Sequence, residues 1–122
     1  MTLCSPCCGV APESASGGET HERELLLGLR EVGDDLHVLL ARHLPHPPAL
    51  APCVERLPMG RGLRWYVAPF VLPRRIARCV AEHGADLLRA HSVRVLGPAC
   101  LLAKRRYGLR IPVVMHLHHW EP

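Results

Sequence analysis

Apolar segments of strand length alternate with amphipathic segments of helix length along this chain, and that alternation restricts the fold more than any other feature. Strand-length apolar runs occur at residues 1–5, 36–40, 53–57, 85–90 and 111–116. Helical periodicity occupies residues 19–32, 69–83 and 98–107. Strand-helix-strand order favours parallel crossovers. We therefore predict one α/β domain over residues 1–122, with a Rossmann-like parallel sheet and helices on both faces.

The first helix has the clearest sequence pattern. Ser16 and Glu19 have the spacing of a capping box, and Gly33 is expected to end the helix. Its predicted core stripe consists of Leu25, Leu26, Leu29 and Val32.

The other helices are bounded by prolines and glycines. Pro73 is expected near the start of the second helix, whose apolar face holds Ile76, Cys79 and Val80. Gly84 and Gly108 are expected to end the second and third helices. Residues 43–52 contain four prolines and should not hold regular structure.

Composition excludes several classes of protein. A net charge of +4, with aromatic residues at 4%, lacks the dense basic stripe and stacking aromatics of a nucleic-acid surface. No run of about 18 apolar residues is present, so we expect no transmembrane segment. The start of the sequence lacks a secretory pattern, which predicts a cytoplasmic protein whose six cysteines are free thiols.

Polar or glycine-rich segments follow three of the predicted strands. They are Gly17-Gly18, His91-Ser92 and His118-His119. Ligands of doubly wound sheets bind beyond the carboxyl ends of the strands, so we expect these segments to meet in one crevice. The glycines would let a phosphate approach the free amides of the next helix, although a loop that needs positive φ explains them as well. His91 could donate or accept a proton near neutral pH, or it could simply pack against the sheet edge.

A metal interpretation rests on Cys4, Cys7 and Cys8 together with His116 and His118. Cys-x-x-Cys is one half of a zinc knuckle, but the second half is missing, so we assign no metal ligands. A small noncatalytic α/β binding module, linked to a metal through Cys4, Cys7 and the histidines, stays open as the alternative function.

Two long segments resemble the amino-terminal domain of the family 4 glycosyltransferases. They are SASGGETHERELLLGLREVGDDLHVLL and ADLLRAHSVRVLGPACLLAKRRYGLRIPVVMHLHHWEP. The matching features are Gly17-Gly18 with the helix that follows, residues 86–91, and residues 112–118. Arg89 departs from the family, which often has a histidine there, and His119 stands where Asp or Gly is common.

The resemblance implies a two-domain GT-B architecture that transfers a sugar from a nucleotide-diphosphate donor to an acceptor hydroxyl, with retention and without a bound metal or other cofactor. His118 would be the catalytic residue beside the transferred sugar. The substrate-binding residues would be Gly17, Gly18, His91, Ser92 and Arg94.

The family's second domain supplies most contacts to the donor nucleotide, and 122 residues that match the first domain leave no room for it. We therefore expect this chain to be the incomplete amino-terminal half of a GT-B fold. Such a fragment would be inactive alone and would need the carboxy-terminal domain as a partner, and it would expose a sheet edge at the fourth or fifth strand.

Overall fold

The computed structural model describes residues 1–7, 10, 12, 17–42, 44–57, 64–90 and 96–115, with backbone only at 17–19 and 64–70. The elements run, in chain order, β1 (Thr2–Cys7), α1 (Gly17–Glu31), β2 (Asp35–Ala41), the 3₁₀ helix η1 (Pro48–Cys53), β3 (Val54–Leu57), α2 (Arg64–His83), β4 (Leu87–Ala90), α3 (Leu96–Tyr107) and β5 (Val113–Met115).

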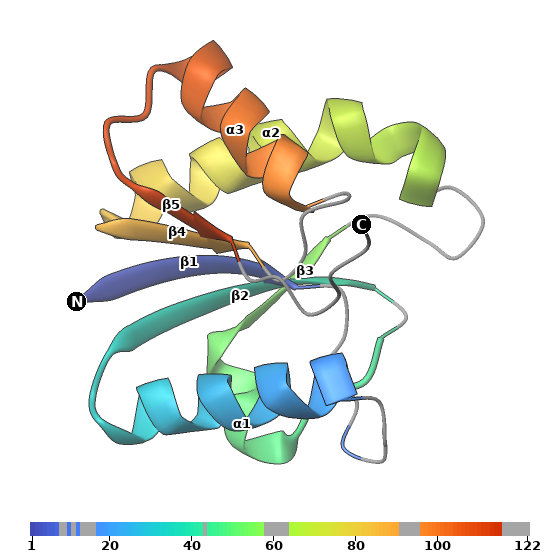
Figure 1. Ribbon diagram of the computed structural model, residues 1–122, viewed down its shortest axis with the longest axis vertical. Helices are drawn as coiled ribbons and strands as arrows, with labels where there is room; N and C mark the ends of the chain where they lie inside the picture. Colours follow the sequence, from blue (N-terminus) through green and yellow to red (C-terminus); the bar gives the residue numbers. More distant parts are fainter. Residues whose placement is uncertain are drawn as a thin grey trace, which may run out of the picture.

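The five described strands form one parallel sheet in the order β3-β2-β1-β4-β5 (Figure 1). Helix α1 and η1 cover one face, and α2 and α3 cover the other. The predicted Rossmann-like sheet with helices on both faces is therefore confirmed. Within the described residues β5 forms one edge of the sheet, and its Val114 is exposed.

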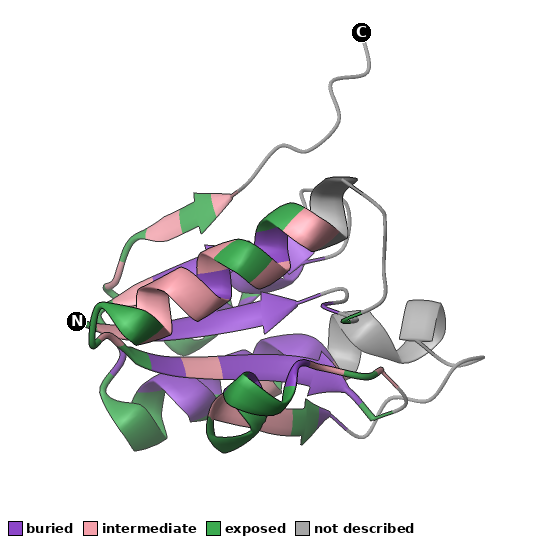
Figure 2. Cartoon of the chain, turned by 90° about the horizontal axis from the view of Figure 1, so that it is seen from below, coloured by how far each residue is buried: buried purple, intermediate pink, exposed green. Residues whose placement is uncertain are grey.

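Each face of the sheet has its own apolar core, because successive strand residues point to opposite faces. In β1, Cys4 belongs to the core under α2 and α3, whereas Leu3 and Cys7 belong to the core under α1. The central strands are buried nearly throughout (Figure 2). This burial explains why they are continuous apolar runs rather than alternating ones.

Strand β1 continues beyond Pro6, where the sequence predicted its end. Proline cannot donate to a sheet ladder and is normally excluded from central strands. Here β1 pairs with β4 only through Leu3 and Cys4, so Pro6 lies beyond the stretch that is paired on both sides. It still pairs with Leu39 of β2 and is fully buried.

The predicted helix ends are confirmed, because Gly33, Gly84 and Gly108 have φ values of 96°, 63° and 65°. The predicted stripe of α1 is wrong at Val32, which is 78% exposed. The helix ends at Glu31, so Val32 lies in the turn rather than on the buried face. Leu26 is fully buried, and Ser16 lies outside the described residues.

Two predictions around prolines are wrong. Helix α2 begins at Arg64, so Pro73 lies inside the helix and not near its start. Pro73 is fully buried beside Leu72 and Ile76, and burial of this face offsets the backbone hydrogen bond that proline cannot donate. Residues 48–53 form η1 instead of an irregular loop, since the fixed φ of proline suits the start of a short helix.

No helix in the described part of the chain combines the length and the apolar character needed to cross a membrane.

Candidate functional site

The carboxyl ends of β1 and β4 define the place where a ligand site is expected. Strand β1 pairs with β2 on one side and with β4 on the other. The connection after β1 leads to α1 on one face, whereas the connection after β4 leads to α3 on the opposite face. Connections that diverge in this way leave a crevice between them, and doubly wound proteins bind ligands at this switch point.

Gly17 and Gly18 are the first two residues of α1, not a loop before it. The first amides of a helix have no partner within the helix, and they attract anionic groups. The position of the two glycines thus agrees with the phosphate-approach interpretation. Arg23, in the second turn of α1, donates from Nη1 to the carbonyl oxygen of Pro12 at 3.1 Å and ties the preceding connection to the helix.

A buried ion pair lies beside the switch point. The guanidinium of Arg89 on β4 is paired with the carboxylate of Glu22 on α1, and its Nη1 also donates to Ser5 Oγ on β1 at 3.2 Å. Glu22 and Ser5 are fully buried, and Arg89 is 3% exposed. A buried charge needs such partners, because removal from water costs several kcal/mol per ion.

This ion pair joins three elements that the sequence separates widely. It connects the first turns of α1 to β4 across β1, so it holds α1 against the carboxyl half of the sheet. Sequence reasoning treated Arg89 as a departure from the family and missed Glu22. A signal was available, because Glu22 lies four residues before the buried Leu26 and therefore shares its helix face.

Asp86, which also belongs to the family-like segment, has a different place. It lies at the amino end of β4, where its Oδ2 accepts a hydrogen bond from the backbone amide of Thr2 at 3.0 Å. The Asp86 amide in turn donates to the Thr2 carbonyl at 2.8 Å. This carboxylate therefore fixes the start of β4 against β1, at the amino ends of the strands and away from the switch point.

The remaining predicted site residues, namely His91, Ser92, Arg94, His116, His118 and His119, lie outside the described residues. The structure does describe the strand ends from which the segments carrying these residues leave. β4 ends at Ala90 and β5 ends at Met115. These two strands are neighbours, and β4 is also the neighbour of β1. The three connections expected to carry the site thus leave from adjacent strands.

Cys4 and Cys7, the cysteines of the alternative metal-linked interpretation, are divided by the sheet. Three residues apart on a strand, the two thiols point to opposite faces and enter different cores. They do not form half of a zinc knuckle. All five described cysteines, which are Cys4, Cys7, Cys53, Cys79 and Cys100, are free thiols, as predicted. Burial raises the pKa of Cys100 to about 12, so this thiol is a packed apolar group at neutral pH.

The fold defines the class of protein first: a Rossmann-like α/β domain with a switch point between β1 and β4 and a helix amino terminus beside it. The family described as Glycosyltransferase Family 4 matches residues 15–122. The chain therefore belongs to the family 4 glycosyltransferases, and its function is of the glycosyltransferase type, with a sugar donor and an acceptor as partners. A comparison with curated proteins finds no significant match.

Proposed function

We propose that this domain takes part in the transfer of a glycosyl group from a nucleotide-diphosphate sugar to an acceptor hydroxyl, with retention of anomeric configuration. Family membership supports the reaction class. The single structural observation that carries the site assignment is the switch point, where the connections after β1, β4 and β5 leave from adjacent strands. A cytoplasmic location stays a prediction.

In this proposal the start of α1 faces the charged part of the substrate. The backbone amides of Gly17 and Gly18 have the direction and the partial positive charge that suit a diphosphate. Neither residue carries a Cβ, so an oxygen atom can approach the backbone closely. The ion pair of Glu22 and Arg89 acts as a positioning element, since it anchors the first turns of α1 to the sheet.

His118 is proposed as the catalytic residue, and His91, Ser92 and Arg94 as acceptor-side binding residues. An imidazole beside the transferred sugar would donate a hydrogen bond to it and stabilise the charge that develops in the transition state. No bound metal or other cofactor is needed in this scheme. Following the family resemblance, we also propose that a carboxy-terminal domain supplies most contacts to the donor nucleotide.

The test uses an active form that includes the carboxy-terminal domain. His118→Ala should lower kcat at least about 10-fold, the order of effect expected for the loss of one preorganised donor. His119→Ala is the matched control, because alternation along an extended chain would turn its side chain to the opposite side. Wild-type turnover in His118→Ala would refute the catalytic assignment, and a product of inverted configuration would refute the retaining mechanism.

A further inference from the structure

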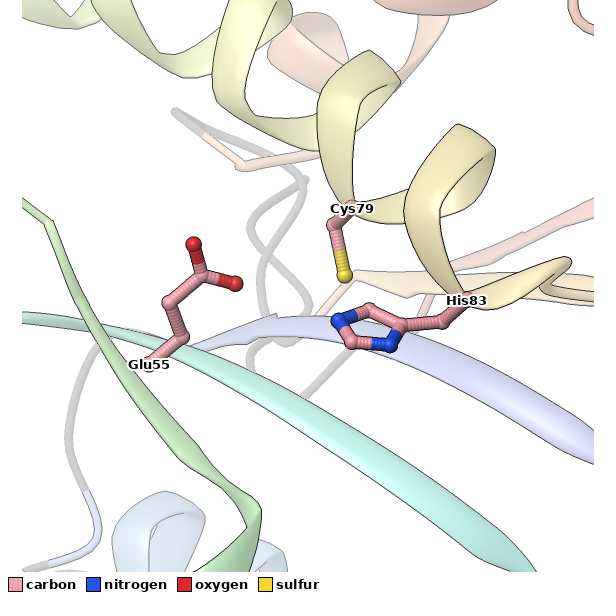
Figure 3. A group of neighbouring side chains, drawn as sticks. All are labelled: Glu55, Cys79 and His83. Carbon is pink, nitrogen blue, oxygen red and sulfur yellow. The ribbon is translucent and has the colours of Figure 1, made fainter.

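A second polar cluster lies on the face of the sheet that α2 covers. It consists of Glu55 on β3 and of Cys79 and His83 on α2 (Figure 3). One ligand atom of each residue, namely a carboxylate oxygen, the thiol sulfur and an imidazole nitrogen, lies within 4.8 Å of the other two. The cluster belongs to the opposite face from the ion pair of Glu22 and Arg89, so it does not depend on the proposed transfer reaction.

The local geometry explains why these side chains meet. Cys79 and His83 are four residues apart on α2 and therefore share one side of the helix. Glu55 precedes Leu57 by two residues, and Leu57 packs in the core under α2, so Glu55 points to the same face. Figure 3 shows the thiol, the ring and the carboxylate turned toward a common space. The cluster thus connects an edge strand to the carboxyl-terminal half of α2.

Neighbouring groups fix the orientation of two of the three side chains. The ring of His37 stacks on that of His83, with centroids 3.6 Å apart and planes inclined by 12°. His37 Nε2 in turn lies 3.1 Å from Asp35 Oδ1. Arg75 Nη2 donates to Glu55 Oε1 at 2.8 Å. Support of this kind is what metal-binding side chains need in order to be held in place before the ion arrives.

The donor set suits zinc. Thiolate, imidazole and carboxylate are the three ligand types that bind Zn²⁺, and three protein ligands plus water complete a tetrahedral site. Ligand atoms in such a site are roughly 3.3–3.6 Å apart, as follows from Zn–ligand distances of about 2.0–2.3 Å. The separations here need only side-chain adjustment to reach that spacing. Cys79 is buried, whereas His83 is exposed, so an ion can enter from the solvent side.

The ion pair between Glu55 and Arg75 is the main competitor for a cation. A carboxylate offers about four lone-pair positions on two oxygens, so it can keep a hydrogen bond from Arg75 and still bind an ion. The Glu55 side chain is 33% exposed, which leaves its carboxylate room to turn toward an ion while Oε1 keeps the hydrogen bond from Arg75.

We propose that Glu55, Cys79 and His83 form a Zn²⁺ site, with water as the fourth ligand, that ties β3 to α2. On binding, hydrated Zn²⁺ exchanges its six water ligands for three protein ligands and one retained water, so five waters are released. The Cys79 sulfur gives its proton to solvent as the sulfur–zinc bond forms. His37 and Arg75 are positioning residues, not ligands. The metal would add a cross-link between two elements that are already joined by the packing of Leu57 and by the ion pair of Glu55 and Arg75.

The experiment is a titration of the reduced, metal-free full chain with Co²⁺, followed by displacement with Zn²⁺. We expect one equivalent of Co²⁺ to give a thiolate-to-cobalt charge-transfer band and the intense visible bands of four-coordinate cobalt. Zn²⁺ should then displace the cobalt and raise the Tm of the chain. Absence of these bands, or a Tm that does not respond to Zn²⁺, would overturn the proposal.

Variants identify the ligands. His83→Gln is the primary variant because the side chain is exposed and its loss should not unfold the chain; we expect affinity to fall at least about 10-fold. Cys79→Ser should abolish the charge-transfer band. Glu82→Gln is the matched control, because it removes a neighbouring exposed carboxylate that pairs with Arg78 instead. Its affinity should equal that of the wild type.

Two results would place the metal elsewhere. Full affinity in His83→Gln would show that the ion binds outside this cluster. Retention of the charge-transfer band in Cys79→Ser would show that another cysteine supplies the thiolate. Cys100→Ala, which removes a buried thiol outside the cluster, controls for a general effect of losing a cysteine and should bind like the wild type.

Discussion

The two faces of the sheet accommodate ionisable side chains in different ways. Under α1, Glu22 and Arg89 neutralise each other inside a closed core. Under α2, Glu55, Cys79 and His83 gather at a margin that solvent reaches. A charge in a closed core must find its partner within the chain, whereas polar groups at an open margin can be satisfied by water or by an ion. The degree of burial therefore distinguishes the structural ion pair under α1 from the candidate ligand site under α2.

The largest expected effect on stability comes from breaking the buried ion pair of Glu22 and Arg89. Arg89→Met leaves the carboxylate of Glu22 buried without its cation, and the free energy of unfolding should fall by about 3–5 kcal/mol. Urea denaturation followed by circular dichroism measures this change. That loss is a large part of the total stability of a small domain.

The double variant Glu22→Met/Arg89→Met separates the two explanations of such a loss. Replacing both charges by apolar groups of similar volume should restore most of the stability, because no uncompensated charge remains. If the double variant is as unstable as Arg89→Met, packing of the Arg89 side chain matters more than its charge. The claim that the buried charges under α1 depend on each other would then be wrong.

A smaller effect is the pH dependence of stability that arises from a buried thiol in the core under α2. Burial raises the pKa of Cys100 from 9.0 to about 12, so the folded state holds this proton more tightly than the unfolded state. Stability is therefore unaffected below pH 9 and falls as the pH rises toward 12. Between pH 8 and 10 the loss from this thiol should be about 1.4 kcal/mol.

The measurement is urea denaturation at both pH values in the wild type and in Cys100→Ala. The variant should be less stable at pH 8, because a fully buried side chain is shortened, but it should lose less stability on going to pH 10. Equal pH dependence in the two proteins would contradict the assignment.

Two backbone effects of similar or smaller size are expected, one on each face of the sheet. Gly84 ends α2 with a φ of 63°, so Gly84→Ala should cost about 1–2 kcal/mol through strain in the left-handed region. Gly28 lies inside α1, and a Cβ added there would meet no other atom within 4 Å, so Gly28→Ala should add about 0.5–1 kcal/mol through helix propensity. Thermal unfolding of both variants checks the opposite signs, and destabilisation by Gly28→Ala would indicate a contact near that position.

Sequence reasoning was most reliable where one element determined the outcome. The apolar period of residues 76–80 correctly identified a buried helix face, and Gly33 correctly marked a helix end. It failed at Pro73 and Pro6, where local propensity argued for a boundary and burial outweighed it. The family-like histidines stay predictions, since they lie outside the described residues.

The amino-acid sequence by itself determined the alternation of strands and helices, the parallel sheet and the resemblance to the family, because these depend on periodicity and motifs within short segments. The tertiary structure decided the strand order, the switch point between β1 and β4, and the two polar clusters. Glu22 meets Arg89, and Glu55 meets Cys79, only after helices have packed on opposite faces of the sheet. Such pairings depend on which face each connection crosses, and no local pattern of residues records that choice.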